Sequence, residues 1–492
     1  MLKKLSVECL NAEQKAVYDK VVDSPIKVMQ IGEGNFLTSF FDWMLYKAIV
    51  AGKYEGSVAL TCPLNFDQKI NTLKEQDMLY TVTQRGFKDN VEIDESDIIS
   101  VFSKVFNYNV DWNSFMEIAE LESLEVIISN TTEAGLAYKE VELDKVSVDG
   151  LYPGKLTAFL MHRFESIKDK SKKLLIFPCE LVDDNGKVLE EMVKKHAESF
   201  GTSAEFKTWL NESCAFLSNL VDRIVPGFPR ENTQEYFEKL GYIDNAASVC
   251  EPFFLWGIEG SEEYDKILPL KSAGLNVKWA DSLYDIHLLK VSILNGSHTL
   301  ITPLGILKGF ERVDELVEDP SEKAFLNEAL QNEIIPSLKN DDAEEYAKTI
   351  LQRFRNPHLK HKLESISMNS VSKFVNRDLP TVKAYIKDNN SLPKNMVTGL
   401  AGLLRFYQIV QKEDKYVGYG FKGQEYPVFD VPNVLEFMSN VNKEYAVKNE
   451  EYVRAVLKNE ELWGEDLTQI AGLSEAVNEA LESLEKKYAK GN

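Results

Sequence analysis

Short apolar runs separated by polar turns predict a series of strands and helices over the first 200 residues. The β-prone runs are 26–31, 57–61, 79–83, 125–130 and 173–179. Stretches with an apolar period of about 3.6 residues, typical of amphipathic helices, lie at 11–23, 35–50 and 187–199. Strands that alternate with helices in this way are typical of an α/β domain built on a doubly wound parallel sheet.

The pattern changes after about residue 275. Helical periods dominate from there, apart from a strand-like run at 416–421, and the charge runs of the helical tail from residue 448 fit a solvated face. We therefore predict an N-terminal α/β domain over residues 1–275 and a mainly α-helical C-terminal domain over residues 276–492.

A glycine turn follows the first predicted strand. Gly32 and Gly34 lie between this strand and the helix 35–50, so the backbone N–H groups at the helix N-terminus could hold a pyrophosphate. Leu37 replaces the third glycine of the full fingerprint, and a purely structural turn explains the pattern equally well. The candidate cofactor-binding residues of a Rossmann-like domain are Ile31, Gly32, Glu33, Gly34, Asn35 and Phe36.

Two other strand ends bear on the same site. Asn130 and Thr131 follow the strand 125–130, at the edge of a parallel sheet where ligands bind, although an ordinary polar turn would look the same. An NAD-specific site often has an acidic residue after the second strand, but Thr61 and Cys62 stand there. These residues therefore do not separate NAD from NADP.

The stretch KVSILNGSHTL in the second half combines three polar groups with apolar cover. On an α-helix, Lys290, Asn295 and His298 fall within an arc of about 140°. An apolar neighbourhood lowers the pKa of a lysine, which could then take a proton from an alcohol while an amide and an imidazole hold the oxygen. Alternatively, the lysine reaches solvent and the other two satisfy each other or the backbone.

Composition limits the classes of molecule that the protein can bind and the compartment in which it works. The net charge of −22 argues against nucleic acid or an anionic membrane as partner, but leaves room for a small anionic substrate in a local basic pocket. Five scattered cysteines and six histidines without ligand spacing indicate a reducing compartment and no metal site. With neither a signal segment nor a long apolar run, we expect a cytoplasmic protein; its oligomeric state is left open.

Several motifs, in order along nearly the whole chain, resemble the polyol-specific long-chain dehydrogenases, or mannitol dehydrogenase family. Lys290, Asn295 and His298 match the spacing of the catalytic signature of that family. The other matching stretches are QIGEGNFL (30–37), ISNTTEAG (128–135), PGKLTAFL (153–160), LVDRIVP (220–226), NVKWADSLYDIHLLK (276–290) and RFRNPHLKHKLESISMNSVSKF (353–374).

The resemblance implies an oxidoreductase that uses NAD and no metal. Lys290 would be the general base in alcohol oxidation and the general acid in ketone reduction, Asn295 would polarise the reacting oxygen, and His298 would orient the substrate. Asp222 would assist proton transfer by the lysine, or it would form a buried pair with Arg223.

The likeness favours the branch that interconverts a keto-uronate and an aldonate. Lys373 and Arg377 could then bind the substrate carboxylate, although exposed basic residues are usually just solvated. The alternatives are another sugar-acid or a mannitol-type polyol specificity and, more remotely, an inactive dinucleotide-binding sensor.

Two positions depart from the family pattern. Leu181 replaces an asparagine that assists the oxyanion, and Asn185, four residues later, is a candidate substrate contact that need not replace it. His287 stands where some members have an acidic residue, so a proton relay by that route is doubtful.

Overall fold

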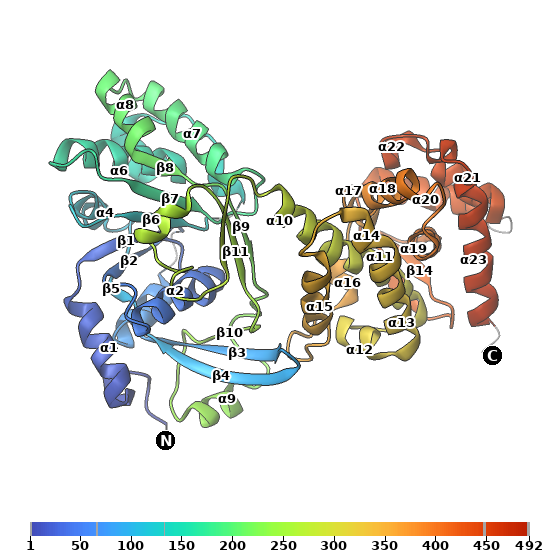
Figure 1. Cartoon of the computed structure of the whole chain (residues 1–492), viewed down its shortest axis with the longest axis horizontal. Coiled ribbons are helices and arrows are strands. Elements are labelled where there is room, and N and C mark those ends of the chain that lie inside the picture. Colours follow the sequence, from blue (N-terminus) through green and yellow to red (C-terminus); the bar gives the residue numbers. More distant parts are fainter. Residues whose placement is uncertain (1, 65–66, 132, 446–448, 490–492) are drawn as a thin grey trace. The chain divides into compact units, whose positions relative to one another are not determined.

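The computed structural model describes residues 2–64, 67–131, 133–445 and 449–489. The chain forms two compact units, Met1–Leu283 and Tyr284–Asn492 (Figure 1). The change of pattern in the sequence placed this division after residue 275. The strand Val277–Ala280 pairs in parallel with Leu255–Glu259, and this pairing keeps residues 277–280 in the first unit.

The first unit is an α/β domain. Its strands are β1 Ile26–Ile31, β2 Ser57–Cys62, β3 Tyr80–Lys88, β4 Val91–Ile99, β5 Phe102–Asn107, β6 Val126–Ser129, β7 Leu174–Pro178, β8 Cys214–Phe216, β9 Asn219–Asp222, β10 Ser248–Cys250, β11 Leu255–Glu259 and β12 Val277–Ala280. Its helices are α1 Ala12–Asp23, α2 Asn35–Val50, α3 Gln68–Glu75, α4 Trp112–Ala119, α5 Val146–Asp149, α6 Tyr152–Ser166, α7 Asn185–Ser199, α8 Ala204–Ser213 and α9 Thr233–Leu240.

The central sheet is parallel, with the strand order β5-β2-β1-β6-β7-β8. Strand β1 shows why both faces are covered: Val28 packs into one hydrophobic core with α2, while Met29 and Ile31 pack into another with α4, α6, α7 and α8. The chain moves from β1 to β2 on one side and returns to β6 on the other. This reversal confirms the predicted doubly wound, Rossmann-like sheet.

Two small sheets accompany it, in the orders β10-β3-β4 and β12-β11-β9. The second carries Trp256, whose ring lies 5.8 Å from that of Phe40 on α2 and 5.1 Å from that of Phe177 on β7. Trp256 therefore fixes this sheet against the helix that begins at the glycine turn.

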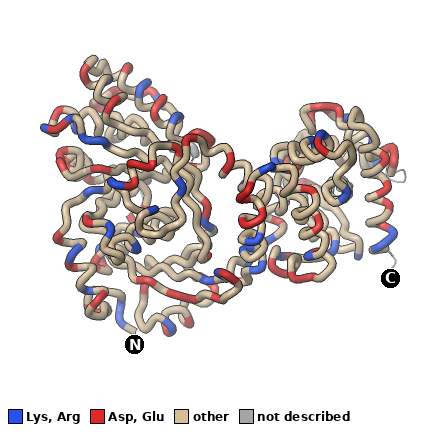
Figure 2. Tube along the Cα trace, in the orientation of Figure 1, with Lys and Arg blue, Asp and Glu red and all other residues tan. Residues whose placement is uncertain are grey.

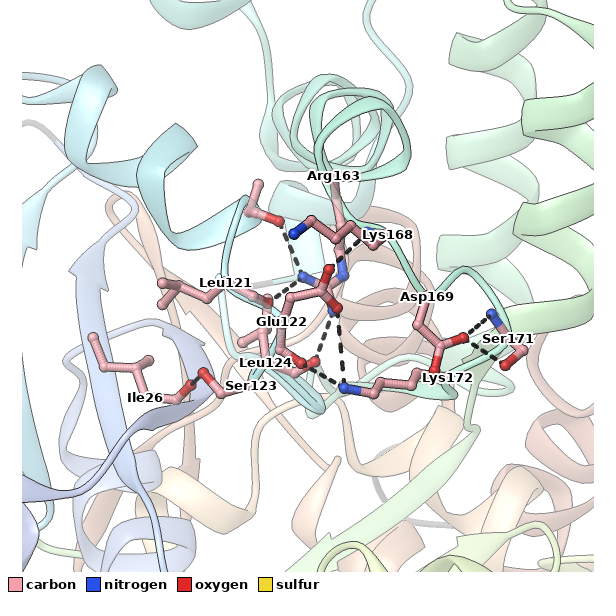
Figure 3. Close-up of polar contacts among 11 residues, drawn as sticks. Ile26, Leu121, Glu122, Ser123, Leu124, Arg163, Lys168, Asp169, Ser171 and Lys172 are labelled. Atoms are coloured by element: carbon pink, nitrogen blue, oxygen red, sulfur yellow. Dashed lines mark hydrogen bonds and ion pairs between the residues drawn. The ribbon is translucent and has the colours of Figure 1, made fainter.

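A buried arginine fastens one loop of the first unit (Figure 3). Arg163 on α6 is 2% exposed and donates to the carbonyl oxygens of Ala119, Leu121 and Leu124 at 2.8–3.0 Å. Ala119 is the last residue of α4, and the other two carbonyls lie in the connection to β6, so the arginine ties this connection to α6.

The second unit is mainly helical, as predicted, around its own hydrophobic core. Its helices are α10 Tyr284–Leu289, α11 Gly296–Lys308, α12 Val313–Glu318, α13 Pro320–Ala329, α14 Ile335–Leu338, α15 Ala343–Phe354, α16 Leu363–Ile366, α17 Ser370–Arg377, α18 Leu379–Asn389, α19 Lys394–Phe406, α20 Pro432–Tyr445, α21 Asn449–Leu457, α22 Glu460–Trp463 and α23 Leu473–Ala489. It also has two π-helical segments, Lys290–Asn295 and Leu330–Ile334, and a small antiparallel sheet of β13 Val410–Lys412, β14 Lys415–Tyr419 and β15 Glu425–Pro427.

Helix α11 lies in the middle of this unit and packs against α16, α17 and α19. Glycines on α19 make the close contact possible, since a Cβ at Gly399 would stand 2.1 Å from Leu300 and one at Gly402 would stand 2.4 Å from Leu304. Acidic residues are spread over many elements of each unit (Figure 2). No helix of the described part of the chain is long and apolar enough to cross a membrane.

Candidate active site

The glycine turn of the first unit has the geometry of an anion-binding helix start. Gly32 adopts φ +127°, and a Cβ there would lie 2.9 Å from the carbonyl oxygen of Asn130. Gly34 caps α2, so no side chain accepts from the first amides, and the first turn carries no acidic residue. The turn thus offers N–H donors at a positive helix end, which suits a dinucleotide pyrophosphate.

Asn130 and Thr131 lie beside this turn at the carboxyl ends of β1, β6 and β7. The backbone N–H of Asn130 donates to Ile31, and its side-chain amide donates to the carbonyl oxygen of Cys179. Thr131 donates through both its backbone N–H and its hydroxyl to Glu180. Their side chains therefore hold the loop, and burial raises the pKa of the Glu180 carboxyl. Thr132 lies outside the described residues.

Behind the turn lies a charged network that sequence reasoning missed. Lys69 Nζ is 3.3 Å from both Asn35 Oδ1 and Thr38 Oγ1, and burial lowers its pKa to about 8. Tyr80 donates at 3.0 Å to Asp42, whose pKa burial raises to about 7. Lys69 and Tyr80 lie 31 to 38 positions away from their partners on α2, so no local motif could have indicated the network.

In the second unit, the predicted catalytic triplet spans a junction between two kinds of helix. Lys290 and Asn295 are the first and last residues of a π-helical segment, and His298 lies in the first turn of α11. A π-helix bonds residue i to i+5, so it brings positions 290 and 295 closer to one face than an α-helix would. Lys290 and Asn295 are partly exposed, while Ser292, Ile293 and Leu294 are buried.

His298 is held as a neutral ring. It is 7% exposed, stacks on Phe354 at 4.2 Å and meets His361 edge-on at 5.2 Å. Burial lowers its pKa well below the usual value, and His361, Arg353, Arg377 and Lys373 lower it further. Its Nε2 is buried without a hydrogen-bond partner among the described residues. A neutral imidazole with an uncommitted ring nitrogen is suited to hydrogen-bond a hydroxyl group.

Lys373 and Arg377 on α17 lie near this histidine. Lys373 Nζ donates to the carbonyl oxygen of Ile366 at 2.8 Å. Arg377 donates at 3.1 Å to Thr299, whose hydroxyl in turn donates to the carbonyl oxygen of Asn295. Arg377 therefore supports the turn that carries Asn295, a role that the sequence did not reveal.

The remaining predicted residues lie in the first unit or at the start of the second. Asp222 ends β9 and is buried, while Arg223 donates to the carbonyl oxygens of Glu251 and Ser39. His287 lies on α10 and is exposed, and Leu181 is 71% exposed.

Asn185 has a structural environment. Its amide donates to the carbonyl oxygens of Glu180 and Asn219, and its Oδ1 accepts from the backbone N–H groups of Gly186 and Asn219. These bonds tie the start of α7 to β9. Substrate binding by Asn185 stays a prediction.

Within the described ranges, the His, Cys, Asp and Glu residues form no cluster that could hold a metal ion. The Rossmann-domain model of the mannitol dehydrogenase family matches residues 26–272, and the model of its C-terminal domain matches residues 284–485. The chain belongs to the mannitol dehydrogenase family. Membership confirms the expected fold class and identifies the chain as a dehydrogenase.

Curated relatives of this mannitol dehydrogenase family member match along almost their whole length. The altronate oxidoreductase of Bacillus subtilis (strain 168) is 38% identical over 467 residues, which are 94% of this chain and 93% of that protein. The altronate oxidoreductase of Halalkalibacterium halodurans is 37% identical over 472 residues, 94% of this chain and 91% of that protein.

A solved structure shows the same fold. Pseudomonas fluorescens mannitol 2-dehydrogenase, in a ternary complex with NAD and D-mannitol, is 21% identical with a TM-score of 0.65, covering 96% of this chain and 94% of that chain. At 21% identity, this similarity supports a common fold and nothing further.

Proposed function

We propose that this family member interconverts D-tagaturonate and D-altronate with NAD as the hydride carrier. The similarity to altronate oxidoreductases carries the proposal, because it extends over 94% of this chain. The basic residues around His298 add support, since a uronate brings a carboxylate that a neutral polyol lacks. The scattered cysteines favour a cytoplasmic location.

The first unit would bind the cofactor. NAD, when bound, supplies the nicotinamide that accepts or returns a hydride. The open N–H groups at the start of α2 fit its pyrophosphate, and the glycine at position 32 lets β1 and β6 approach closely. The residues assigned to NAD are Ile31, Gly32, Glu33, Gly34, Asn35, Phe36, Asn130 and Thr131.

The second unit would handle the proton. A neutral Lys290 takes the hydroxyl proton of D-altronate and returns a proton when D-tagaturonate is reduced. The amide of Asn295 donates to the oxygen as negative charge develops on it, and neutral His298 orients the substrate by hydrogen bonding. Asp222 is proposed to assist proton transfer to and from Lys290, because it matches the position of an aspartate in the family motif.

Lys373 and Arg377 are assigned to the substrate carboxylate. Lys373 uses one of its three donors on Ile366, so two remain for a ligand. Arg377 contributes its charge while it holds Thr299.

The substrate assignment is tested by NADH oxidation with D-tagaturonate, D-fructuronate and D-fructose at equal concentration. We expect fast turnover of D-tagaturonate alone. Turnover of D-fructuronate or D-fructose instead would keep the lysine mechanism and overturn the substrate. NADH binding without turnover of any of the three would indicate a dinucleotide sensor.

The lysine mechanism is tested with two substitutions. Lys290→Ala should fold, bind NADH and lose about 10²–10⁴-fold in kcat. Lys290→Arg keeps the positive charge but cannot give up its proton at neutral pH, so it should be equally inactive. Exposed Lys387 on α18 provides the control, and Lys387→Ala should keep wild-type turnover. Substantial activity in Lys290→Arg would show that charge alone suffices and would overturn proton transfer by the lysine.

A further inference from the structure

Basic side chains from three neighbouring segments of the second unit gather around one face of α11. Several Lys and Arg positions are visible near α15 in Figure 2. Four of these side chains are close enough to lower the pKa of His298. They are Arg353 at the end of α15, His361 between α15 and α16, and Lys373 and Arg377 on α17. Such a concentration of positive charge favours an anionic ligand.

His361 has a fixed place in this cluster. Its ring meets the ring of His298 at 5.2 Å and 85°, and its carbonyl oxygen accepts from the backbone N–H of Val313 at 3.0 Å. His298 in turn is stacked on Phe354. His361 is therefore held beside a residue of the catalytic signature from a loop that the signature does not include.

The acidic groups that act on Lys373 and Arg377 are Asp430 and Asp378. Asp430 acts on Lys373 and accepts a hydrogen bond from the Tyr407 hydroxyl. Asp378 is fully buried beside Arg377, and burial raises the pKa of its carboxyl well above the usual value, which disfavours its charged form. A carboxylate brought by a ligand would thus meet an excess of positive charge.

We propose that His361 and Lys373 together receive the carboxylate of the substrate and that His361 takes up a proton when the carboxylate binds. This inference rests on the proposed function and adds a residue and a proton-linked step to it. His361 would then select acids over neutral polyols, because only an acid stabilises its charged form.

The direction of the proton movement follows from the surroundings of His361. Burial and the ammonium of Lys373 lower its pKa in the ligand-free protein, so it is neutral near neutral pH. His298 on α11, Arg353 on α15 and Arg377 on α17 face the same cluster, while Asp430 before α20 acts through Lys373. A carboxylate against the ring favours the imidazolium and raises the pKa, so binding consumes a proton and weakens as the pH rises.

The test is calorimetric titration of D-tagaturonate into the full-length enzyme saturated with NAD, a pair that cannot react because both partners are oxidised. Titrations in buffers with different ionisation enthalpies report the number of protons taken up. We expect proton uptake by the wild type, with binding that weakens above neutral pH. His361→Asn should lose the uptake, flatten the pH dependence and raise Kd about tenfold or more.

His358→Asn is the matched control, because His358 is exposed on the same loop and should leave Kd and proton uptake unchanged. Unchanged NADH binding and circular dichroism in His361→Asn would show that the variant is folded. Binding to the wild type without proton uptake, or uptake that persists in His361→Asn, overturns the inference and leaves the proposed function intact. Failure of D-tagaturonate to bind the wild type overturns both.

Discussion

At the scale of single residues, the cofactor turn depends on a carboxyl group that is fully buried. Asp42 accepts hydrogen bonds from Tyr80 and Gln30, and Gln30 also donates to the carbonyl oxygen of Gly32. Burial raises the pKa of Asp42 from 3.8 to about 7. Gln30 therefore links the protonation of Asp42 to the position of the glycine turn.

This shift predicts how stability depends on pH. Because the pKa is higher in the folded state, the folded protein holds a proton that the unfolded chain releases above pH 4. The resulting stabilisation is complete below the unfolded pKa and is lost as the pH rises through about 7. Asn cannot ionise, so the free energy of unfolding of Asp42→Asn should rise relative to that of the wild type by a few kcal/mol between about pH 4 and pH 8. Urea unfolding at a series of pH values measures this difference. A constant difference across this range would contradict the assignment.

How far single residues could be predicted depended on their spacing in the chain. Lys290, Asn295 and His298 lie within nine positions, so their residue types and apolar neighbours were enough to indicate a site. Asp42 and Lys69 come together only through folding, and so do His298 and His361, which are 63 positions apart. Tertiary contacts of this kind leave no local pattern.

At the scale of elements, apolar periodicity located β1, β2, β6, β7 and the first half of β3, together with α1, α2 and α7. It missed α6 and β4, and also β5, whose polar Ser103 and Lys104 interrupt the run, and the three-residue β8. It also predicted an ordinary helix at Lys290, because a π-helical segment of six residues is too short to show an apolar period of its own. The difference lies in backbone hydrogen bonds, and it changes which side chains share a face.

The fastening of the α4–β6 connection by Arg163 predicts a large effect of one substitution (Figure 3). Arg163→Met keeps much of the apolar stem but leaves three carbonyl oxygens without their charged donor. The free energy of unfolding should fall by about 3 kcal/mol or more. His162→Gln, on the neighbouring and partly exposed position, should change it by less than about 0.5 kcal/mol. Similar losses in the two variants would show that the three hydrogen bonds contribute little.

At the scale of the whole molecule, each unit has its own hydrophobic core. The change from alternating strands to helices was visible in the sequence, but the parallel pairing of β12 with β11 was not, because strand partners are set by tertiary contact. Five of the six tryptophans lie in the first unit, at 43, 112, 209, 256 and 279. Tryptophan fluorescence therefore reports mainly the unfolding of the unit that carries the glycine turn.

Cofactor binding should therefore raise the stability of the first unit, as measured by tryptophan fluorescence during unfolding. A ligand at 100 times its Kd stabilises the folded state by about 2.7 kcal/mol, so saturating NAD should raise the fluorescence midpoint of the wild type. Gly32→Ala forces a Cβ to within 2.9 Å of the Asn130 carbonyl oxygen and should abolish most of this rise.

Gly52, at the other end of α2, also has a positive φ, but nothing lies near its missing Cβ. Gly52→Ala should therefore lower the starting stability by about 1 kcal/mol through backbone strain alone and keep the full response to NAD. An equal response in the two variants would mean that the approach of β1 to β6 at Gly32 does not shape the cofactor site.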